Sequence, residues 1–235
     1  MTQTRNILVT GSSRGIGKAI LAALQGHNAV GHSTRGGGGL LAADLDQAGA
    51  AESLWNEALE RLGGRIDVLV NNAGVFEAAP IDQPSGEWVA AWERTMRINL
   101  TASAELCRLA VTHFQKEGGG RIVNIASRAA YRGDSPQHWH YAASKAGMVA
   151  MTKSIARGFA GDGVLAFAVC PGFTASEMIE EYMASRGGTA ITADIPLGRV
   201  ATGEEVAETV RWLAIDAPPS STGAVIDVNG ASYVR

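Results

Sequence analysis

Short apolar runs alternate with longer amphipathic stretches along the chain, and this alternation predicts a parallel α/β fold. The apolar runs are rich in β-branched residues and end at glycine or polar residues, so they are interpreted as buried strands at 7–10, 29–33, 40–45, 66–70, 121–126, 164–169 and 224–228. Between them, apolar residues recur at helical spacing, as at 47–62 and 204–216. With no linker, repeat or composition break, we expect one Rossmann-type doubly wound domain over residues 1–235, with a seven-stranded parallel sheet and helices on both faces.

One crossover departs from this pattern. Only about six residues, including the four glycines 36–39, connect the second and third expected strands. A parallel crossover normally needs a dozen or more residues, usually with a helix. We therefore expect a bare glycine loop here, and a more open site beside it.

Composition narrows the classes of function. The formal charge is -3 and the basic residues form no run, so neither nucleic acid nor an anionic membrane is expected as a partner. Cys107 and Cys170 both lie in apolar segments and are interpreted as buried thiols, without disulfide or metal-binding spacing. No apolar run approaches the length of a membrane span, and the polar start at 1–6 shows no signal-peptide core. These features favour a cytoplasmic protein without a metal.

A glycine-rich turn follows the first expected strand and precedes a helix-like stretch at 18–25. It reads Gly11-Ser12-Ser13-Arg14-Gly15-Ile16-Gly17. Glycines let a backbone approach a pyrophosphate, and a helix N-terminus offers it free N–H groups and a positive dipole end. The spacing is T-G-x-x-x-G-x-G, and an ordinary turn is the alternative interpretation. The order of strand, turn and helix favours a dinucleotide site.

The end of the second expected strand indicates which dinucleotide would bind. A site specific for NAD usually has an acidic residue here for the ribose 2′-hydroxyl. This chain has Ser33, Thr34 and Arg35 instead, and Arg14 in the glycine turn can point to the same place. Two guanidinium groups and two hydroxyls suit a 2′-phosphate, so NADP(H) is favoured and NAD(H) is the alternative. The other interpretation is that both arginines are solvated surface charges.

Tyr141 and Lys145 are spaced as neighbours on one face of an apolar helix. A cation about 4 Å from a phenol contributes roughly 4 kcal/mol at an effective dielectric of about 20. That could lower the pKa of Tyr141 from about 10 by up to ~3 units. Such a phenol can exchange a proton with an alcohol or carbonyl oxygen near neutral pH. Alone, the spacing is also compatible with a packed tyrosine beside a snorkelling lysine.

Taken together, the motifs resemble those of the short-chain dehydrogenase/reductase family, in its compact branch near the 3-oxoacyl-ACP reductases. The resemblance covers essentially the whole chain, from 7 to 230. The family motifs occur in order as Thr10-Gly11-x-x-x-Gly15-x-Gly17, Asp44, Asn71-Asn72-Ala73-Gly74, Asn99, Ser127, Tyr141-x-x-x-Lys145 and Pro171-Gly172-x-Thr174. The resemblance implies an oxidoreductase that transfers a hydride between a nicotinamide cofactor and a carbonyl or secondary alcohol.

The resemblance also implies roles for individual residues. Tyr141 would be the general acid in reduction and the base in oxidation, and Lys145 would lower its pKa and bond the nicotinamide ribose. Ser127 would hold the substrate oxygen. Asn99 would kink its helix and hold a water that connects the lysine to solvent. The cofactor contacts expected from the motifs and the resemblance are Gly11, Ser13, Arg14, Gly15, Ile16, Gly17, Ser33, Thr34, Arg35, Asp44, Leu45, Asn72, Ala73, Gly74, Tyr141, Lys145, Pro171, Gly172 and Thr174.

Two segments bear on the identity of the substrate, which the sequence does not determine. The separation of Ser127 and Tyr141 is one residue longer than is common in similar members, so the loop 128–140 absorbs an extra residue. Either its Trp139 packs on the helix start beside solvated histidines, or His138 or Trp139 shapes the substrate pocket. The expected specificity segment, about 175–199, holds Glu177, Glu180, Glu181 and Asp194, and this acidity weakly disfavours a large anionic carrier protein. A small-molecule carbonyl or alcohol is the expected partner.

Two other functions are weighed against the oxidoreductase. One is a dinucleotide-binding sensor or partner protein that has lost catalysis, which the intact Asn99, Ser127, Tyr141 and Lys145 argue against. The other is an epimerase or dehydratase of the longer family branch, whose additional substrate domain does not fit this length. The resemblance further implies a homo-oligomer, a tetramer or dimer, formed through helices at about 92–114 and 141–160 and the C-terminal segment.

Overall fold

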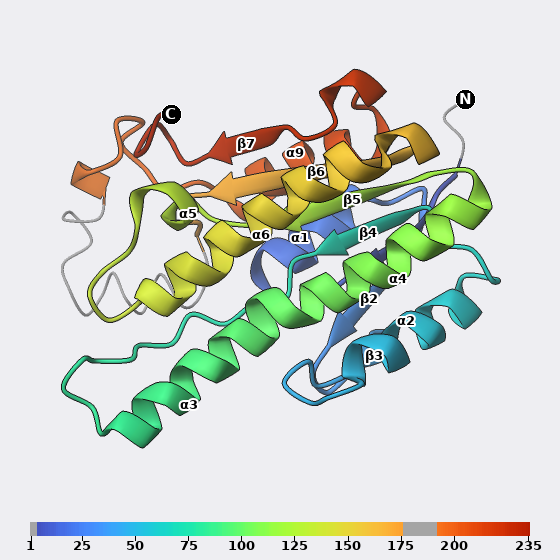
Figure 1. The fold of residues 1–235 in the computed structure, drawn as a ribbon. Coiled ribbons are helices and arrows are strands. Elements are labelled where there is room, and N and C mark those ends of the chain that lie inside the picture. The colour runs from blue at the N-terminus through green and yellow to red at the C-terminus, as the bar shows by residue number, and fades with distance from the viewer. Residues whose placement is uncertain (1–3, 176–191) are drawn as a thin grey trace.

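The sheet of the computed structural model has seven strands in the order β3-β2-β1-β4-β5-β6-β7, and all neighbouring strands are parallel (Figure 1). The structure describes residues 4–175 and 192–235. The doubly wound parallel fold predicted from the sequence is confirmed. The strands are β1 (Asn6–Val9), β2 (Asn28–Ser33), β3 (Leu41–Ala42), β4 (Val68–Asn71), β5 (Gly120–Ile125), β6 (Val164–Pro171) and β7 (Val225–Val228).

Helices pack on both faces of the sheet. On one face, α1 (Gly15–Ala23) and α9 (Gly203–Ile215) contact each other and bury side chains such as Ile20 and Val210. On the other face lie α2 (Ala50–Arg61), α4 (Ala102–Glu117) and α6 (Trp139–Phe159), with Trp55, Phe114 and Ile155 in their core cluster. These buried positions follow the helical spacing of apolar residues. The other helical segments are α3 (Ser85–Met96), α5 (Ala129–Arg132), a π-helical turn (Arg97–Thr101) and 3₁₀ turns at Ala160–Asp162 and Pro219–Ser221.

The crossover between β2 and β3 has no helix, as the sequence predicts. Its four glycines, 36–39, all have positive φ, which favours residues without a side chain. Within the loop, the N–H of Leu40 bonds the carbonyl of Gly37 at 3.0 Å. The expected strand at 40–45 is longer than the observed one, because β3 pairs with β2 only at Leu41 and Ala42. The chain therefore turns away from the edge of the sheet after two residues.

A π-helical turn interrupts the long helix that lies beside the sheet. The backbone stays helical from α3 through the turn at 97–101 and into α4. Asn99, at the centre of the turn, is fully buried. Single π-helical turns inside α-helices often occur at functional sites. The irregularity expected of the helix at Asn99 is thus present.

Within residues 4–175 and 192–235, no helix has the length and apolar character needed to cross a bilayer. The same residues include no group of three or more His, Cys, Asp or Glu side chains placed to hold a metal ion. Cys107 and Cys170 are buried and free, as the sequence predicts.

Candidate active site

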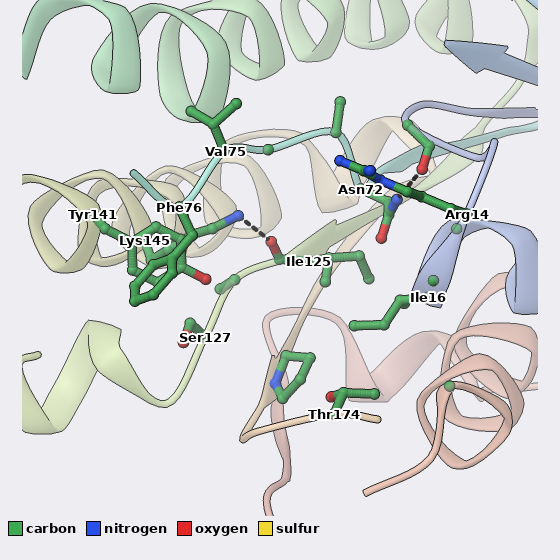
Figure 2. A pocket seen from close by; sticks show the side chains of 18 of the residues that line it. Arg14, Ile16, Asn72, Val75, Phe76, Ile125, Ser127, Tyr141, Lys145 and Thr174 are labelled. Carbon is green, nitrogen blue, oxygen red and sulfur yellow. Dashed lines mark hydrogen bonds between the residues drawn. The ribbon is translucent and has the colours of Figure 1, made fainter. Parts of the chain in front are cut away.

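A large cavity of about 1670 Å³ lies at the carboxyl ends of the strands. A site for one small ligand usually measures roughly 300–1,000 Å³, so this cavity has room for a dinucleotide together with a second molecule. Residues that follow β1, β2, β4, β5 and β6 form its wall. Figure 2 shows Arg14 and Asn72 at one end, and Ser127 and Tyr141 at the other.

The glycine turn after β1 packs tightly on its protein side. Gly11 has φ +64, and a Cβ added there would lie 2.6 Å from the Cα of Ala73. A Cβ on Gly17 would overlap the carbonyl oxygen of Gly11. By contrast, Gly15, the first residue of α1, has open space where its Cβ would point. No side chain caps α1, and its first turn lines the cavity. An uncapped helix N-terminus facing a cavity fits the pyrophosphate of a dinucleotide.

The end of β2 forms the next part of the wall. Buried His32 accepts a hydrogen bond from the N–H of Gly11 at 3.2 Å, and its other ring nitrogen lies 2.8 Å from the carbonyl of Ala43. Burial lowers the pKa of His32, so the ring is neutral and its Nε2–H donates to that carbonyl. The histidine thereby holds the glycine turn against the chain beyond β3. Arg14, Ser33 and Thr34 line the cavity, whereas Arg35 is exposed and does not.

The turn after β4 is fastened to the end of β1. The hydroxyl of Thr10 accepts hydrogen bonds from the N–H groups of Asn72 and Ala73, both at 3.0 Å. The side chain of Asn72 donates to the carbonyls of Thr10 and Gly11, at 3.0 and 2.8 Å. Asn72, Ala73 and Gly74 all line the cavity. Across it, Asp44 also lines the wall and accepts from the N–H of Asp46 at 3.1 Å.

The predicted catalytic side chains meet where β5 ends beside α6. Tyr141 and Lys145 occupy successive turns of α6, and the Lys145 Nζ lies 5.8 Å from the centre of the Tyr141 ring. That ammonium donates to the carbonyl of Ile125 at 2.8 Å, as Figure 2 shows. Ser127 follows β5, accepts from the N–H of Ala129 at 3.1 Å and hydrogen-bonds the phenol of Tyr141. Two hydroxyls and an ammonium are therefore gathered on one wall of the cavity.

The electrostatics differ from the sequence-based expectation. Burial raises the pKa of Tyr141 to about 12, with the hydrogen bond from Ser127 opposing it. Burial also lowers the pKa of Lys145 to about 8. The expectation that the pKa of the phenol falls below 10 is wrong for this structure, because burial of the phenol raises its pKa instead. The phenol is therefore protonated at neutral pH.

Asn99 acts on this site from behind its wall. Its side-chain oxygen accepts from the N–H of Val75 at 2.8 Å, and its side-chain nitrogen donates to the Val75 carbonyl at 3.0 Å. The same nitrogen lies 3.2 Å from the hydroxyl of Ser144 in α6. Asn99 does not line the cavity, but it joins the turn after β4 to the helix that carries Tyr141 and Lys145. The implied water beside Asn99 stays a prediction.

The end of β6 closes the cavity next to Ser127. Pro171, Gly172 and Thr174 line it, as does Phe173 between them. The hydroxyl of Thr174 donates to the carbonyl of Gly172 at 3.3 Å. A Cβ on Gly172 would lie 2.9 Å from that of Asn229, so this turn needs a glycine to reach the C-terminal segment.

The positions of the aromatic residues in the loop 128–140 show whether they line the cavity. Neither His138 nor Trp139 lines the cavity. Trp139 is 50% exposed and meets the edge of Trp88 on α3, with ring centres 6.0 Å apart. His138 stacks on Phe76, which lines the cavity and meets the edge of the Tyr141 ring 4.8 Å away. His138 thus reaches the pocket through Phe76 and through Ser135, a lining residue whose hydroxyl lies 2.7 Å from its Nδ1. His140 is fully buried, so it is not the solvated histidine of the simpler interpretation.

Most of the predicted site residues meet in this one cavity. Those that line it are Gly11, Ser13, Arg14, Gly15, Ile16, Gly17, Ser33, Thr34, Asp44, Leu45, Asn72, Ala73, Gly74, Ser127, Tyr141, Lys145, Pro171, Gly172 and Thr174. Sequence reasoning missed His32, Phe76 and Arg128, although His32 and Arg128 stand next to the predicted Ser33 and Ser127. Of the expected specificity segment, residues 176–191, with Glu177, Glu180 and Glu181, lie outside the described residues, whereas Asp194 lines the cavity.

Several known proteins with similar sequences are described as reductases. A family model described as Enoyl-(Acyl carrier protein) reductase matches residues 22–231. A 3-oxoacyl-[acyl-carrier-protein] reductase of Vibrio cholerae is 33% identical over 97% of this chain and 96% of its own. An acetoacetyl-CoA reductase of Rhizobium meliloti is 33% identical over 98% and 99%. Among solved structures, a protein from Agrobacterium tumefaciens described as a candidate gluconate dehydrogenase superposes with a TM-score of 0.86, at 26% identity over 98% of this chain and 97% of its own.

Proposed function

The chain belongs to the short-chain dehydrogenase/reductase family, and from this premise we propose that it reduces a carbonyl compound with NADPH, using Tyr141 as the proton donor. It is an oxidoreductase that transfers a hydride between a nicotinamide cofactor and a carbonyl or secondary alcohol. One observation carries the proposed site: Ser127, Tyr141 and Lys145 share a cavity wall opposite the glycine turn. No feature favours a sensor without catalysis.

The proposed mechanism follows from the state of these side chains. When bound, the nicotinamide supplies a hydride to the carbonyl carbon. The hydroxyls of Ser127 and Tyr141 hold the carbonyl oxygen, on which negative charge develops. Because burial keeps the pKa of Tyr141 at about 12, the phenol carries a proton to deliver at neutral pH. Lys145, whose pKa is about 8, is mostly cationic at pH 7 and stabilises the phenolate that remains.

The preference for NADPH rests on the end of β2. No carboxylate stands there, and Arg14, Ser33 and Thr34 line the cavity. Arg35 is exposed at the mouth of the short crossover, and we propose that it contacts the 2′-phosphate from outside the cavity wall. The remaining predicted contacts, from Asp44 to the adenine and from Thr174 to the carboxamide, belong to the same proposal.

Cofactor titrations test this preference. Nicotinamide fluorescence follows the binding of NADPH and of NADH to the wild type, Arg14→Ala and Arg35→Ala. Each lost contact to the phosphate should weaken NADPH binding by about 10- to 150-fold and leave NADH binding unchanged. Arg5→Ala is the matched control, because Arg5 precedes β1 at the amino ends of the strands and does not line the cavity. Equal binding of NADH and NADPH by the wild type would contradict the preference.

The reacting group of the substrate is proposed to be a carbonyl. The two curated relatives act on 3-oxoacyl groups, whereas the family model is named for an enoyl reductase. Two hydroxyls on one wall suit a carbonyl oxygen, which accepts two hydrogen bonds. We expect a small 3-oxoacyl compound to oxidise NADPH, and the matched enoyl compound not to do so. Turnover of the enoyl compound alone would contradict this assignment.

The wider organisation is also proposed. Residues 1–235 would form one catalytic domain, in the cytoplasm, that acts on small molecules. A tetramer or dimer would form through the helices at 92–114 and 141–160 and the C-terminal segment. Sedimentation that shows a monomer at micromolar concentration would refute the oligomer without touching the reaction.

A further inference from the structure

A buried guanidinium next to the proposed catalytic serine has no role in the mechanism above. Arg128 directly follows Ser127, and only 8% of its surface is exposed. It lines the same cavity as Ser127 and Tyr141. Its Nη1 is buried and has no hydrogen-bond partner among the described residues. Such an orphaned donor on a cation is costly, because the charge loses its hydration without gaining a partner.

The backbone around Arg128 holds the side chain in this place. Its N–H bonds the carbonyl of Pro171 at 3.0 Å, which ties the start of α5 to the end of β6. The guanidinium lies 4.6 Å from the centre of the Phe173 ring. A guanidinium over the face of an aromatic ring is attracted by that ring, which helps to hold the arginine in place. The arginine is therefore fixed where a ligand in the cavity can reach it.

The charged groups around Arg128 leave it without an ion pair in the described part of the chain. Arg132 lies close enough to repel it, while Asp134 and Asp194 attract it. Asp194 instead pairs with Arg132, with its carboxylate 3.4 Å from that guanidinium. Burial and the repulsion by Arg132 lower the pKa of Arg128, which remains charged. A ligand anion would supply the missing partner.

We infer that Arg128 binds a carboxylate of the substrate, so that the enzyme acts on small oxo acids or the corresponding hydroxy acids. This inference rests on the proposed carbonyl reduction at Ser127 and Tyr141. Ser127, Tyr141 and Arg128 line one cavity, so a single small substrate can place its carbonyl at the two hydroxyls and its carboxylate at the arginine. A carboxylate matches the planar fork of an arginine with two parallel hydrogen bonds. The unpaired Nη1 would be one of the donors.

Matched pairs of substrates test the inference. Short 2-oxo and 3-oxo acids are compared with their methyl esters, which keep the carbonyl and lose the charge, and NADPH oxidation gives kcat and KM. The wild type should prefer the acid in kcat/KM by about 10- to 150-fold. Arg128→Met should remove that preference, while its kcat on the ester and its binding of NADPH stay as in the wild type. Arg128→Lys, which keeps the charge without the fork, should retain part of the preference.

Arg94→Met is the matched control, since it removes another cavity arginine that already has a carboxylate partner, Asp46, and that does not act on Arg128. It should keep the preference for the acid. Turnover of the esters with no preference for the acids by the wild type would overturn the inference and leave the proposed function standing. Weaker NADPH binding by Arg128→Met would also overturn it, because the arginine would then serve the cofactor. If no carbonyl compound oxidises NADPH, the proposed function itself fails and the inference falls with it.

Discussion

Replacing Lys145 with methionine should stabilise the fold at neutral pH while it removes a group with a proposed role in catalysis. Lys145 is 4% exposed, and burial lowers its pKa from 10.5 to about 8. Above pH 10.5 this lysine is neutral in both the folded and the unfolded state, so its burial does not lower the free energy of unfolding. The cost of burying its charge grows as the pH falls below 10.5 and is nearly complete once the pH has fallen through 8. At pH 7 the folded protein therefore carries nearly the whole cost of burying the charge.

The size of this cost follows from the two pKa values. At about 1.36 kcal/mol per pKa unit, the cost is at most about 3.4 kcal/mol. It is about 3.3 kcal/mol at pH 7 and about 2.0 kcal/mol at pH 9, which is a difference of about 1.3 kcal/mol. The variant also loses the hydrogen bond from Lys145 to Ile125, worth roughly 1 kcal/mol. That loss is nearly independent of pH, so the change between pH 7 and 9 isolates the charge.

Urea unfolding of the wild type and Lys145→Met at fixed protein concentration measures the effect. The free energy of unfolding of the wild type should gain about 1.3 kcal/mol on that of the variant between pH 7 and pH 9. Tyr141, Cys107 and Cys170, whose pKa values are raised by burial, stay protonated in both folded proteins up to pH 9 and so cancel in the comparison, although Cys170 interacts electrostatically with Lys145. If the two proteins differ by the same free energy of unfolding at pH 7 and at pH 9, the buried charge of Lys145 does not carry this cost.

Two further substitutions probe the supports of the site. Gly11→Ala should cost more stability than Gly38→Ala, by about 1–3 kcal/mol in urea unfolding, because both have positive φ but only the first Cβ would meet Ala73. Equal losses would show that no clash exists. Asn99→Ala should lower the free energy of unfolding by about 2–4 kcal/mol, since it leaves the N–H and carbonyl of Val75 unpaired. Hydrogen exchange at the Val75 amide that stays as slow as in the wild type would argue against this anchoring role.

The fold was largely predictable because each strand and helix has a strong local pattern. The glycine crossover could be predicted from length alone, since six residues cannot form a crossover helix. The early end of β3 could not be predicted, because Ala43 continues the apolar run that precedes it. In the structure, its carbonyl instead hydrogen-bonds the ring of His32. Where the strand ends depends on that tertiary contact, which local sequence does not encode.

The site was predicted in position but not in its electrostatics. The spacing of Tyr141 and Lys145 places them on one helix face, yet it does not reveal that the ammonium bonds the Ile125 carbonyl. Burial of both groups also depends on strands far away in the sequence. Arg128 was missed for the same reason, because an arginine after a strand becomes informative only once its burial and missing partner are known.

Tyr141 is proposed to deliver the proton in an NADPH-dependent carbonyl reduction. Single-turnover oxidation of bound NADPH by a small oxo acid and its ester, in the wild type and Tyr141→Phe, tests it most directly. We expect one equivalent of NADPH to be oxidised by the wild type, and a rate about 10²- to 10⁴-fold lower in the variant with unchanged NADPH affinity. A variant that turns over as fast as the wild type, or a wild type that leaves NADPH unoxidised, would contradict it.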